Sequence, residues 1–398
     1  MNRNDFEMLN NDIIYFDNGA TTFKPKCVVD AVVDYYTKYT ANAHRGDYDI
    51  SGIVDSKYEG VRDKVKNFIG ATKRDEIIYT KGTTESINTI VFGYMYYHLN
   101  SGDEVLITKS EHASNILPWL ELARRKGVVV KFIPLNENHE VTIENLKSVM
   151  TDKTKVISLA HITNVIGDVR PIEEIGNLCS EKDILFVVDA AQSIGHMKMD
   201  VNKYNISFLA FSAHKMLGPT GVGILYGKYD LLNKLVPLEY GGGMNSYFES
   251  NGELEYKPLP ERLEAGTQNI AGVIGLGEAI DYIQNIGLEN IHKHELELKE
   301  YALRRLREVP NLKIYNENSK SGIVIFNLDK IFSQDTAVFL NHFGICVRAG
   351  NHCAKIVKDE INVTNTCRAS FYLYNTKEEI DKLVDALKEQ DRLFEIIL

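Results

Sequence analysis

The chain has 398 residues, of which 44% are hydrophobic and 25% charged, a composition typical of globular proteins with a large core. Its formal net charge of -10 and the lack of a basic stripe argue against a nucleic-acid partner. The longest apolar runs, such as DILFVVDAA, are too short to span a bilayer, and the N-terminus lacks a signal peptide's hydrophobic stretch. We therefore expect no membrane partner and a cytoplasmic location.

The five cysteines form neither an even set nor a CxxC pair. This pattern argues against a disulfide framework and against a zinc knuckle, so we expect free thiols and no metal site. Most such thiols are small buried hydrophobes, and a reactive one needs a distinctive setting.

In the first 70 residues we expect an extended segment followed by two helices. From about residue 76 to 226, short apolar strands alternate with amphipathic helical stretches, and this alternation indicates a mostly parallel sheet with both faces covered. The predicted strands are 76–80, 104–108, 128–133, 156–160, 185–190, 207–211 and 222–226. In such α/β sheets, ligands bind beyond the carboxyl ends of the strands.

The pattern changes after residue 227 and predicts a smaller α+β lobe. We expect a long helical stretch at about 271–308, strands near 312–316, 322–327 and 366–371, and an amphipathic helix at about 376–396. We expect three parts: an N-terminal segment that packs with the small domain (1–25), a large domain (26–265) and a small C-terminal domain (266–398).

Polar residues follow several of the predicted strands. KGTTES (81–86) offers Thr84 and backbone N–H groups at a helix N-terminus, which suits either a phosphate or an ordinary N-cap. Next along the chain, His112 follows the strand 104–108 and Asn164 follows the strand 156–160. Ser212 and His214 follow the strand 207–211, where they could complete a phosphate cup.

Asp189 and Lys215 end two successive strands and carry opposite charges. Either residue alone has an ordinary explanation, as a helix N-cap for the aspartate and as a solvated side chain for the lysine. Together at one sheet edge they match what pyridoxal phosphate requires, namely an amine for a Schiff base and a carboxylate that keeps the pyridine nitrogen protonated. A GPTGVG run (218–223) lacks the residue order of either common nucleotide-binding loop.

Nearly the whole chain resembles the cysteine desulfurases of the SufS/CsdA group, which are class V aminotransferase-like enzymes of PLP fold type I. The resemblance is carried by YFDNGATTFKP (15–25), ANAHRGDYDISG (41–52), GTTESIN (82–88), EHASNILPW (111–119), DAAQSIGH (189–196), FSAHKMLGPTGVG (211–223), EAGTQNIAG (264–272), RAGNHCA (348–354) and RASFYLYNT (368–376). RAGNHCA is the most selective of these for the reaction. The fold implied is a large α/β domain with a mostly parallel seven-stranded sheet and a smaller α+β C-terminal domain.

The resemblance implies a role for each matched residue. Lys215 would form the Schiff base with pyridoxal 5'-phosphate, and Asp189 would pair with its ring nitrogen. The other implied contacts to the cofactor are Gln192 and Asn164 at the ring oxygen, His112 stacked on the ring, and Thr84, Ser212 and His214 at the phosphate, with Thr267 reaching the phosphate of the other subunit in a homodimer. Arg368 would clamp the substrate carboxylate, since a guanidinium forms a bidentate pair. His44 would lie near the entrance with Arg45.

Cys353 is the expected nucleophile. It lies in RAGNHCA, where Arg348 and His352 supply nearby cationic groups that favour the thiolate, and Arg348 and Asn164 would also contact the substrate. The remaining cysteines, in apolar, strand-like or helical surroundings, are predicted to be structural: Cys27, Cys179, Cys346 and Cys367. Two departures from the family pattern lie beside the nucleophile, Asn351 in place of a second histidine and the polar segment AKIVKDEINV (354–363).

The implied reaction removes sulfur from L-cysteine, leaving alanine and a persulfide on Cys353. Lys215 would remove the Cα proton, and His112 would donate a proton later. The sulfur would pass to a SufU-like or SufE-like acceptor for iron–sulfur cluster or other thio-cofactor assembly. The alternatives are a selenocysteine lyase, another fold-type I enzyme such as an aminotransferase or epimerase, and an inactive scaffold.

Overall fold

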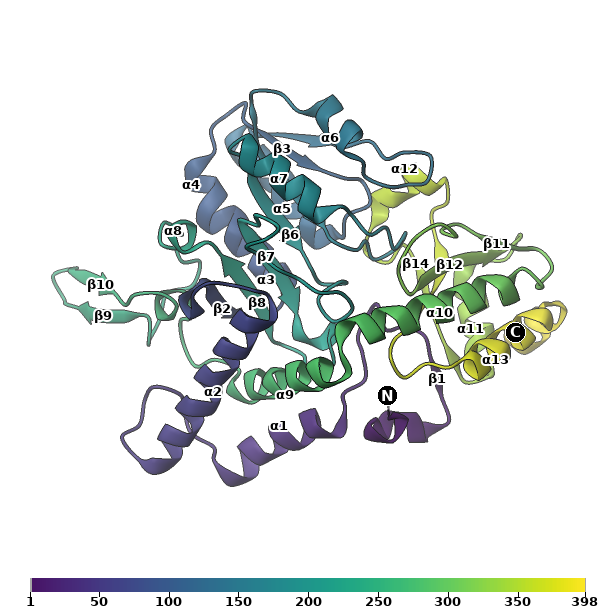
Figure 1. Ribbon diagram of the computed structural model, residues 1–398, viewed down its shortest axis with the longest axis horizontal. Helices are drawn as coiled ribbons and strands as arrows, with labels where there is room; N and C mark the ends of the chain where they lie inside the picture. Colours follow the sequence, from purple (N-terminus) through teal and green to yellow (C-terminus); the bar gives the residue numbers. More distant parts are fainter. Residues whose placement is uncertain (1, 398) are drawn as a thin grey trace.

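The computed structural model describes residues 2–397 and contains a seven-stranded sheet at its centre (Figure 1). The strand order is β2-β8-β7-β6-β5-β3-β4, and β8 is the one strand of this sheet that runs antiparallel to its neighbours. The strands are β2 (Ile77–Thr80), β3 (Glu104–Ile107), β4 (Val129–Phe132), β5 (Thr154–Ala160), β6 (Leu185–Asp189), β7 (Phe208–Ser212) and β8 (Gly223–Gly227). The predicted mostly parallel sheet is confirmed.

In the strands other than the edge strand β4, alternate residues face two separate cores, because successive side chains in a strand point to opposite faces. In β6, for example, Phe186 and Val188 belong to one core and Val187 to the other. The first core is covered by α1 (Lys26–Lys38), α2 (Asp49–Phe68), α6 (Ile143–Val149), α7 (Ile172–Glu181) and α9 (Ile270–Ile286). The second is covered by α3 (Thr83–Asn88), a π-helical turn (Thr89–Met95) that continues into α4 (Tyr96–His98), and by α5 (Leu117–Lys126) and α8 (Tyr229–Leu232).

The long helix expected at 271–308 is two helices. Helix α9 ends at Gly287, whose φ of 87° breaks the helical path, and α10 (Leu288–Leu306) continues from there toward the C-terminal lobe (Figure 1). Glycine adopts this conformation without a Cβ clash, so the break lies where the sequence allows it. Helix α9 shares its buried side chains with the core of the large sheet.

The C-terminal lobe is built on an antiparallel sheet of order β11-β12-β15-β14. Its strands are β11 (Leu312–Ile314), β12 (Ile323–Leu328), β14 (Arg348–Gly350) and β15 (Thr366–Ser370), of which β14 was not predicted. Helices α10, α11 (Ser333–His342), α13 (Lys377–Lys388) and α14 (Leu393–Ile397) pack with it, while α12 (Lys358–Ile361) follows the Cys353 loop. The single helix expected at 376–396 is interrupted by a 3-10 turn at Gln390–Arg392.

The N-terminal segment crosses from the C-terminal lobe to the large sheet. Two 3-10 turns (Arg3–Asp5 and Glu7–Asn11) precede β1 (Ile14–Tyr15), which pairs in parallel with β13 (Ile345–Cys346). Further along, Asn18 donates a hydrogen bond to the Ser370 carbonyl at 2.7 Å. The division of the chain into segments 1–25, 26–265 and 266–398 stays a prediction.

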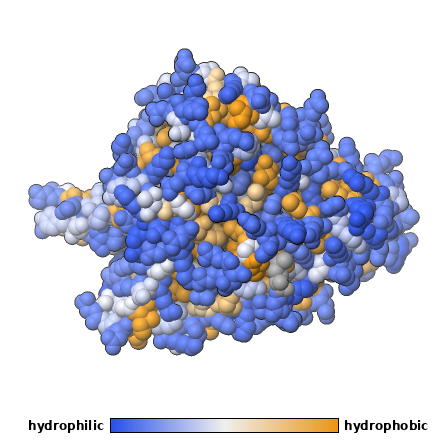
Figure 2. All heavy atoms as spheres, in the orientation of Figure 1, coloured by the Kyte–Doolittle hydropathy of each residue, from blue (hydrophilic) through white to orange (hydrophobic). Residues whose placement is uncertain are grey.

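A β-hairpin of β9 (Asn245–Phe248) and β10 (Leu254–Tyr256) projects from the body of the molecule (Figure 1). Its Phe248 and Leu254 side chains are exposed, and apolar atoms are visible along the hairpin within a mostly hydrophilic surface (Figure 2). Among residues 2–397, no helix combines the length and the apolar character needed to cross a membrane.

Candidate active site

The carboxyl ends of four neighbouring strands, β7, β6, β5 and β3, deliver polar side chains to one cavity of about 210 Å³. These strands run parallel, so their carboxyl ends lie at the same sheet edge. Nine of the residues proposed for the site line this cavity: Thr84, His112, Asn164, Asp189, Gln192, Ser212, His214, Lys215 and Arg348. Thr83, Ser114, Ala20 and Ile162 line it as well.

Lys215 and Asp189 face this cavity from adjacent strand ends. Burial lowers the pKa of Lys215 to about 8, although the nearby Asp189 carboxylate opposes the shift. Burial also raises the pKa of Asp189 to about 6, while the Ala191 N–H, which donates to Asp189 Oδ1 at 2.9 Å, acts in the opposite direction. Within the described residues no ion pair joins the two side chains directly, so both charged groups are available to a molecule lying between them.

One end of the cavity is suited to an anion. The Thr83 N–H and hydroxyl each lie 2.8 Å from Ser212 Oγ, and the Thr84 hydroxyl lies 2.7 Å from Ser114 Oγ. These groups stand at the start of the continuous helical segment 83–98, where backbone N–H groups and the helix dipole favour negative charge. A Cβ at Gly82 would lie 3.3 Å from Ser212 Oγ, so the turn packs closely against the end of β7.

His112 is a neutral imidazole at neutral pH. Its pKa is lowered to about 4 by burial, with the Lys215 and Arg348 charges acting in the same direction. Its Nδ1 accepts the Ser114 N–H at 3.1 Å, which leaves Nε2 to carry the ring proton. His214 is likewise held neutral, because burial lowers its pKa to about 4.

Two amide side chains complete the wall of the cavity. Asn164 donates from Nδ2 to the His352 carbonyl at 2.7 Å, and its buried Oδ1 has no hydrogen-bond partner. Gln192 donates from Nε2 to the Gly19 carbonyl at 2.8 Å. A buried acceptor without a partner costs free energy, and a ligand bearing a hydroxyl group would satisfy it.

Cys353 is exposed on the loop after β14. It is linked to the cavity by its contact with Arg348, a residue that lines the cavity. Arg348 Nη2 is 3.4 Å from Cys353 Sγ, and Arg348 itself lines the cavity. The Cys353 carbonyl accepts the Ala113 N–H at 2.8 Å, which ties the loop to the segment that carries His112. Arg348 therefore provides the positive charge next to this sulfur.

The expectation that His352 adds positive charge is wrong. Its side chain is buried, with Nε2 3.0 Å from both the carbonyl and the hydroxyl of Thr366, and burial lowers its pKa to about 3. Of the other cysteines, Cys179 and Cys367 are buried, Cys346 is partly buried and Cys27 is exposed. Burial raises the pKa of Cys179 and of Cys367 to about 12.

Arg368 is fully buried in β15 next to the cavity wall rather than among the lining residues. It donates from Nη1 to the Asn164 carbonyl and from Nη2 to Asp17 Oδ1, both at 2.8 Å, and its Nε has no partner. Asp17 is a site residue that the sequence did not reveal, since its partner is 351 residues away.

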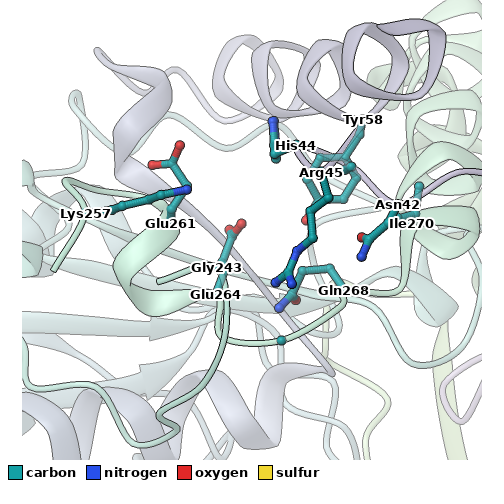
Figure 3. A pocket seen from close by; sticks show the side chains of 12 residues that line it. Asn42, His44, Arg45, Tyr58, Gly243, Lys257, Glu261, Glu264, Gln268 and Ile270 are labelled. Carbon is teal, nitrogen blue, oxygen red and sulfur yellow. The ribbon is translucent and has the colours of Figure 1, made fainter. Parts of the chain in front are cut away.

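His44 and Thr267 lie outside the main cavity. His44 lines a second, smaller pocket of about 50 Å³ together with Arg45, and the two side chains are seen there opposite Glu261 and Lys257 (Figure 3). Its Nε2 is 3.1 Å from Glu59 Oε1, and this hydrogen bond raises the pKa of His44. Thr267 is exposed beside the same pocket and accepts a hydrogen bond from Asn42 at 3.2 Å.

The chain is also clearly similar in sequence to known proteins. The family model described as aminotransferase class-V matches residues 14–383. A probable cysteine desulfurase of Halalkalibacterium halodurans is 43% identical over 98% of this chain and 96% of its own length.

Two solved structures also match nearly the full length of the chain. The apo structure of a cysteine desulfurase from Thermococcus onnurineus NA1 has a TM-score of 0.93 and 38% identity, covering 98% of this chain and 96% of that one. The cysteine desulfurase CsdA from Escherichia coli, in an S-sulfonic acid form, has a TM-score of 0.92 and 33% identity, covering 100% of this chain and 98% of that one.

Proposed function

Because the chain belongs to the class-V aminotransferase family and its similar relatives are cysteine desulfurases, we propose that it removes sulfur from L-cysteine with pyridoxal phosphate as cofactor. The observation that carries the proposal is the meeting of Lys215 and Asp189 in one cavity, with the Arg348–Cys353 contact at its side. The products are L-alanine and a persulfide on Cys353.

The residues of the cavity fit this cofactor. The anion site at Thr84, Ser212 and His214 suits the phosphate, and the buried, unpartnered Asn164 Oδ1 suits the ring hydroxyl. When bound, pyridoxal phosphate acts as an electron sink for the carbon that carries the substrate's amino group.

Lys215 and Asp189 have different acid–base roles. The Asp189 carboxylate would pair with the ring nitrogen of the bound cofactor and favour its protonated form, since a buried carboxylate gains most by pairing with a cation. The Lys215 amine, whose pKa of about 8 makes part of it neutral near pH 7, accepts the Cα proton of the substrate. His112 carries its proton on Nε2 and donates it to the carbon skeleton at the end of the reaction.

Cys353 takes the sulfur. Its Sγ forms a bond to the substrate sulfur as the bond between that sulfur and Cβ breaks, and the electron pair of the broken bond stays with the carbon skeleton. The skeleton then gains two protons, one from His112 at Cβ and one returned to Cα by Lys215, and leaves as alanine. The Arg348 guanidinium stabilises the attacking thiolate, while Arg368 orients the substrate carboxylate through its free Nε–H.

The partners follow from the same proposal. The persulfide of Cys353 passes to an acceptor protein of the SufU-like or SufE-like kind in the cytoplasm, for iron–sulfur cluster or other thio-cofactor assembly. The chain works as a homodimer in which the exposed Thr267 reaches the cofactor phosphate of the other copy, a role supported by its position outside the main cavity of its own chain.

The test compares Cys353→Ser with Cys27→Ser, a variant of the other exposed cysteine. We expect alanine formation from cysteine to collapse in Cys353→Ser while the visible absorption band of the cofactor Schiff base persists, and Cys27→Ser to behave as the parent does. Undiminished alanine formation in Cys353→Ser would reject this cysteine as the nucleophile. Turnover of selenocysteine alone by the parent protein would identify a selenocysteine lyase instead.

A further inference from the structure

Four donors from the N-terminal segment converge on a single carbonyl oxygen, that of His214. They are the Thr22 N–H at 3.0 Å, the Thr21 hydroxyl at 3.1 Å, the Thr22 hydroxyl at 3.2 Å and the Lys24 ammonium at 3.3 Å. A carbonyl oxygen has two lone pairs, so this cluster exceeds what satisfying a buried acceptor requires. His214 is the residue directly before Lys215.

Thr22 contacts both ends of the turn that carries Lys215. Its Oγ1 donates to the His214 carbonyl and accepts the Leu217 N–H at 2.9 Å. Leu217 is buried and has a φ of 66°, in the left-handed region that is costly for a branched side chain. A backbone conformation of this kind persists where surrounding contacts hold it, and the Thr22 hydroxyl is such a contact.

Lys24 contributes a charge without a counter-ion. Its ammonium donates to three neutral oxygens, the Thr21 hydroxyl at 3.2 Å and the carbonyls of Thr22 and His214, and no carboxylate within the described residues lies in ion-pair range of it. Burial lowers its pKa to about 8. A partly buried ammonium without a carboxylate partner directs its charge into the hydrogen bonds to these carbonyl groups.

The segment that makes these contacts is itself anchored to the C-terminal lobe. The Gly19 N–H donates to Ser370 Oγ at 2.8 Å, and the Phe23 N–H donates to the Tyr374 hydroxyl at 3.0 Å. The Phe23 ring stacks on Tyr374 with centroids 5.4 Å apart and on Tyr15 at 4.3 Å. The segment thus fixes the lysine turn relative to β15, the strand that carries Arg368.

We propose that Thr22 is a positioning residue for Lys215, which it holds together with Thr21 and Lys24 by fixing the backbone on both sides of the lysine. The inference rests on the proposed function, since it assigns Thr22 to the placement of the amine that forms the Schiff base. Reactions between bound groups depend steeply on their alignment, so a freed turn slows every step in which the Lys215 amine takes part.

The decisive variants are Thr22→Val, which keeps the shape but removes the hydroxyl, and Thr22→Ser, which restores it. Thr37→Val is the matched control, because the Thr37 hydroxyl also donates to a backbone carbonyl, that of Val33 at 2.8 Å, on the exposed side of α1. Each cofactor-free protein is mixed with pyridoxal phosphate, and the rate at which the Schiff-base absorption band appears is followed.

We expect the band to appear about tenfold more slowly in Thr22→Val and within about twofold of the parent rate in Thr22→Ser and Thr37→Val. In turnover, kcat of Thr22→Val falls by a similar factor while KM stays close to the parent value. Parent rates in a folded Thr22→Val would overturn the inference.

Should Thr22→Val fail to fold, Lys24→Met removes one of the four donors and slows the band by about threefold, and a parent rate in Lys24→Met would then overturn the inference. The parent protein distinguishes a failure of the proposed function from a failure of the role of Thr22. A parent that forms no band at all contradicts the proposed function, whereas a parent that forms it at the same rate as the variants contradicts only the role of Thr22.

Discussion

Replacing Lys215 with methionine in the cofactor-free protein tests the claim that the Lys215 amine is buried in the cavity at a free-energy cost. Burial lowers the pKa of Lys215 from its ordinary value of 10.5 to about 8. This difference corresponds to about 3 kcal/mol by which the charged amine destabilises the folded state below pH 8. Methionine has a similar length and no charge, so the variant is free of that cost.

The sign of the pH dependence follows from proton binding. Below pH 8 the amine is charged in both states and the full cost is present. Between pH 8 and pH 10.5 the unfolded chain binds more protons than the folded one, so the parent gains stability as the pH rises. The Lys215 ammonium also lowers the pKa of Asp189, so this pKa is higher in the variant. The variant therefore loses stability as the pH rises, and this loss adds to the fall in the stability difference between variant and parent.

We therefore expect the stability difference, Lys215→Met minus parent, to fall by about 2.5 kcal/mol between pH 7 and pH 10. Urea denaturation of both proteins at a series of pH values measures this difference. The control is Lys155→Met, an exposed position on β5, for which the difference from the parent stays flat. A flat difference for Lys215→Met as well would refute the burial of this charge.

Two further variants probe the buried charges around the cavity. In Arg368→Lys we expect KM for cysteine to rise about ten- to a hundredfold, because lysine cannot reproduce the Nε–H that the guanidinium leaves free, and steady-state kinetics with an unchanged KM would reject the clamp. In Glu111→Gln we expect a loss of about 3 kcal/mol of unfolding free energy, because Glu111 and Arg170 form a fully buried ion pair and the change leaves the arginine charge with the more distant Asp168 carboxylate, 3.5 Å from its Nε. Urea denaturation measures that loss against Glu181→Gln, an exposed control, and equal stability of the two variants would contradict the reasoning.

The sequence was sufficient to predict where Asp189 and Lys215 lie, because two regularities act together. Continuous apolar runs separated by helical stretches predict parallel strands, and parallel strands bring their carboxyl ends to one edge. The polar residues that follow those runs were therefore predicted to meet, and His112, Asn164, Asp189 and Ser212 do line one cavity. The cofactor-binding roles of these residues rest on the family resemblance and stay predictions.

Contacts between distant segments could not be predicted in the same way. Glu111 and Arg170 are 59 residues apart, and each alone resembles an ordinary exposed charge, yet both are completely buried. The contact between Thr22 and the His214 carbonyl spans 192 residues. No local periodicity encodes such pairs, since they arise from how whole elements pack rather than from the spacing within one of them.

The structure gives a reason for the asparagine at position 351 in the Cys353 loop, which the sequence alone did not explain. The Ala354 N–H donates to the Asn351 carbonyl at 2.9 Å, and the two residues between them, His352 and Cys353, have φ values of 52° and 58°. Two successive positive φ angles define a type I′ turn, which usually holds glycine or asparagine, so this turn is strained.

The strain is offset by hydrogen bonds to the same turn. The Asn351 side chain accepts the Cys353 N–H at 3.1 Å, and the carbonyls of His352 and Cys353 accept from Asn164 and from Ala113. Asparagine is favoured at the first position of a turn because its short side chain reaches the backbone two residues on. Asn351, which stands where the family resemblance implies a second histidine, is thus suited to hold the sulfur beside Arg348.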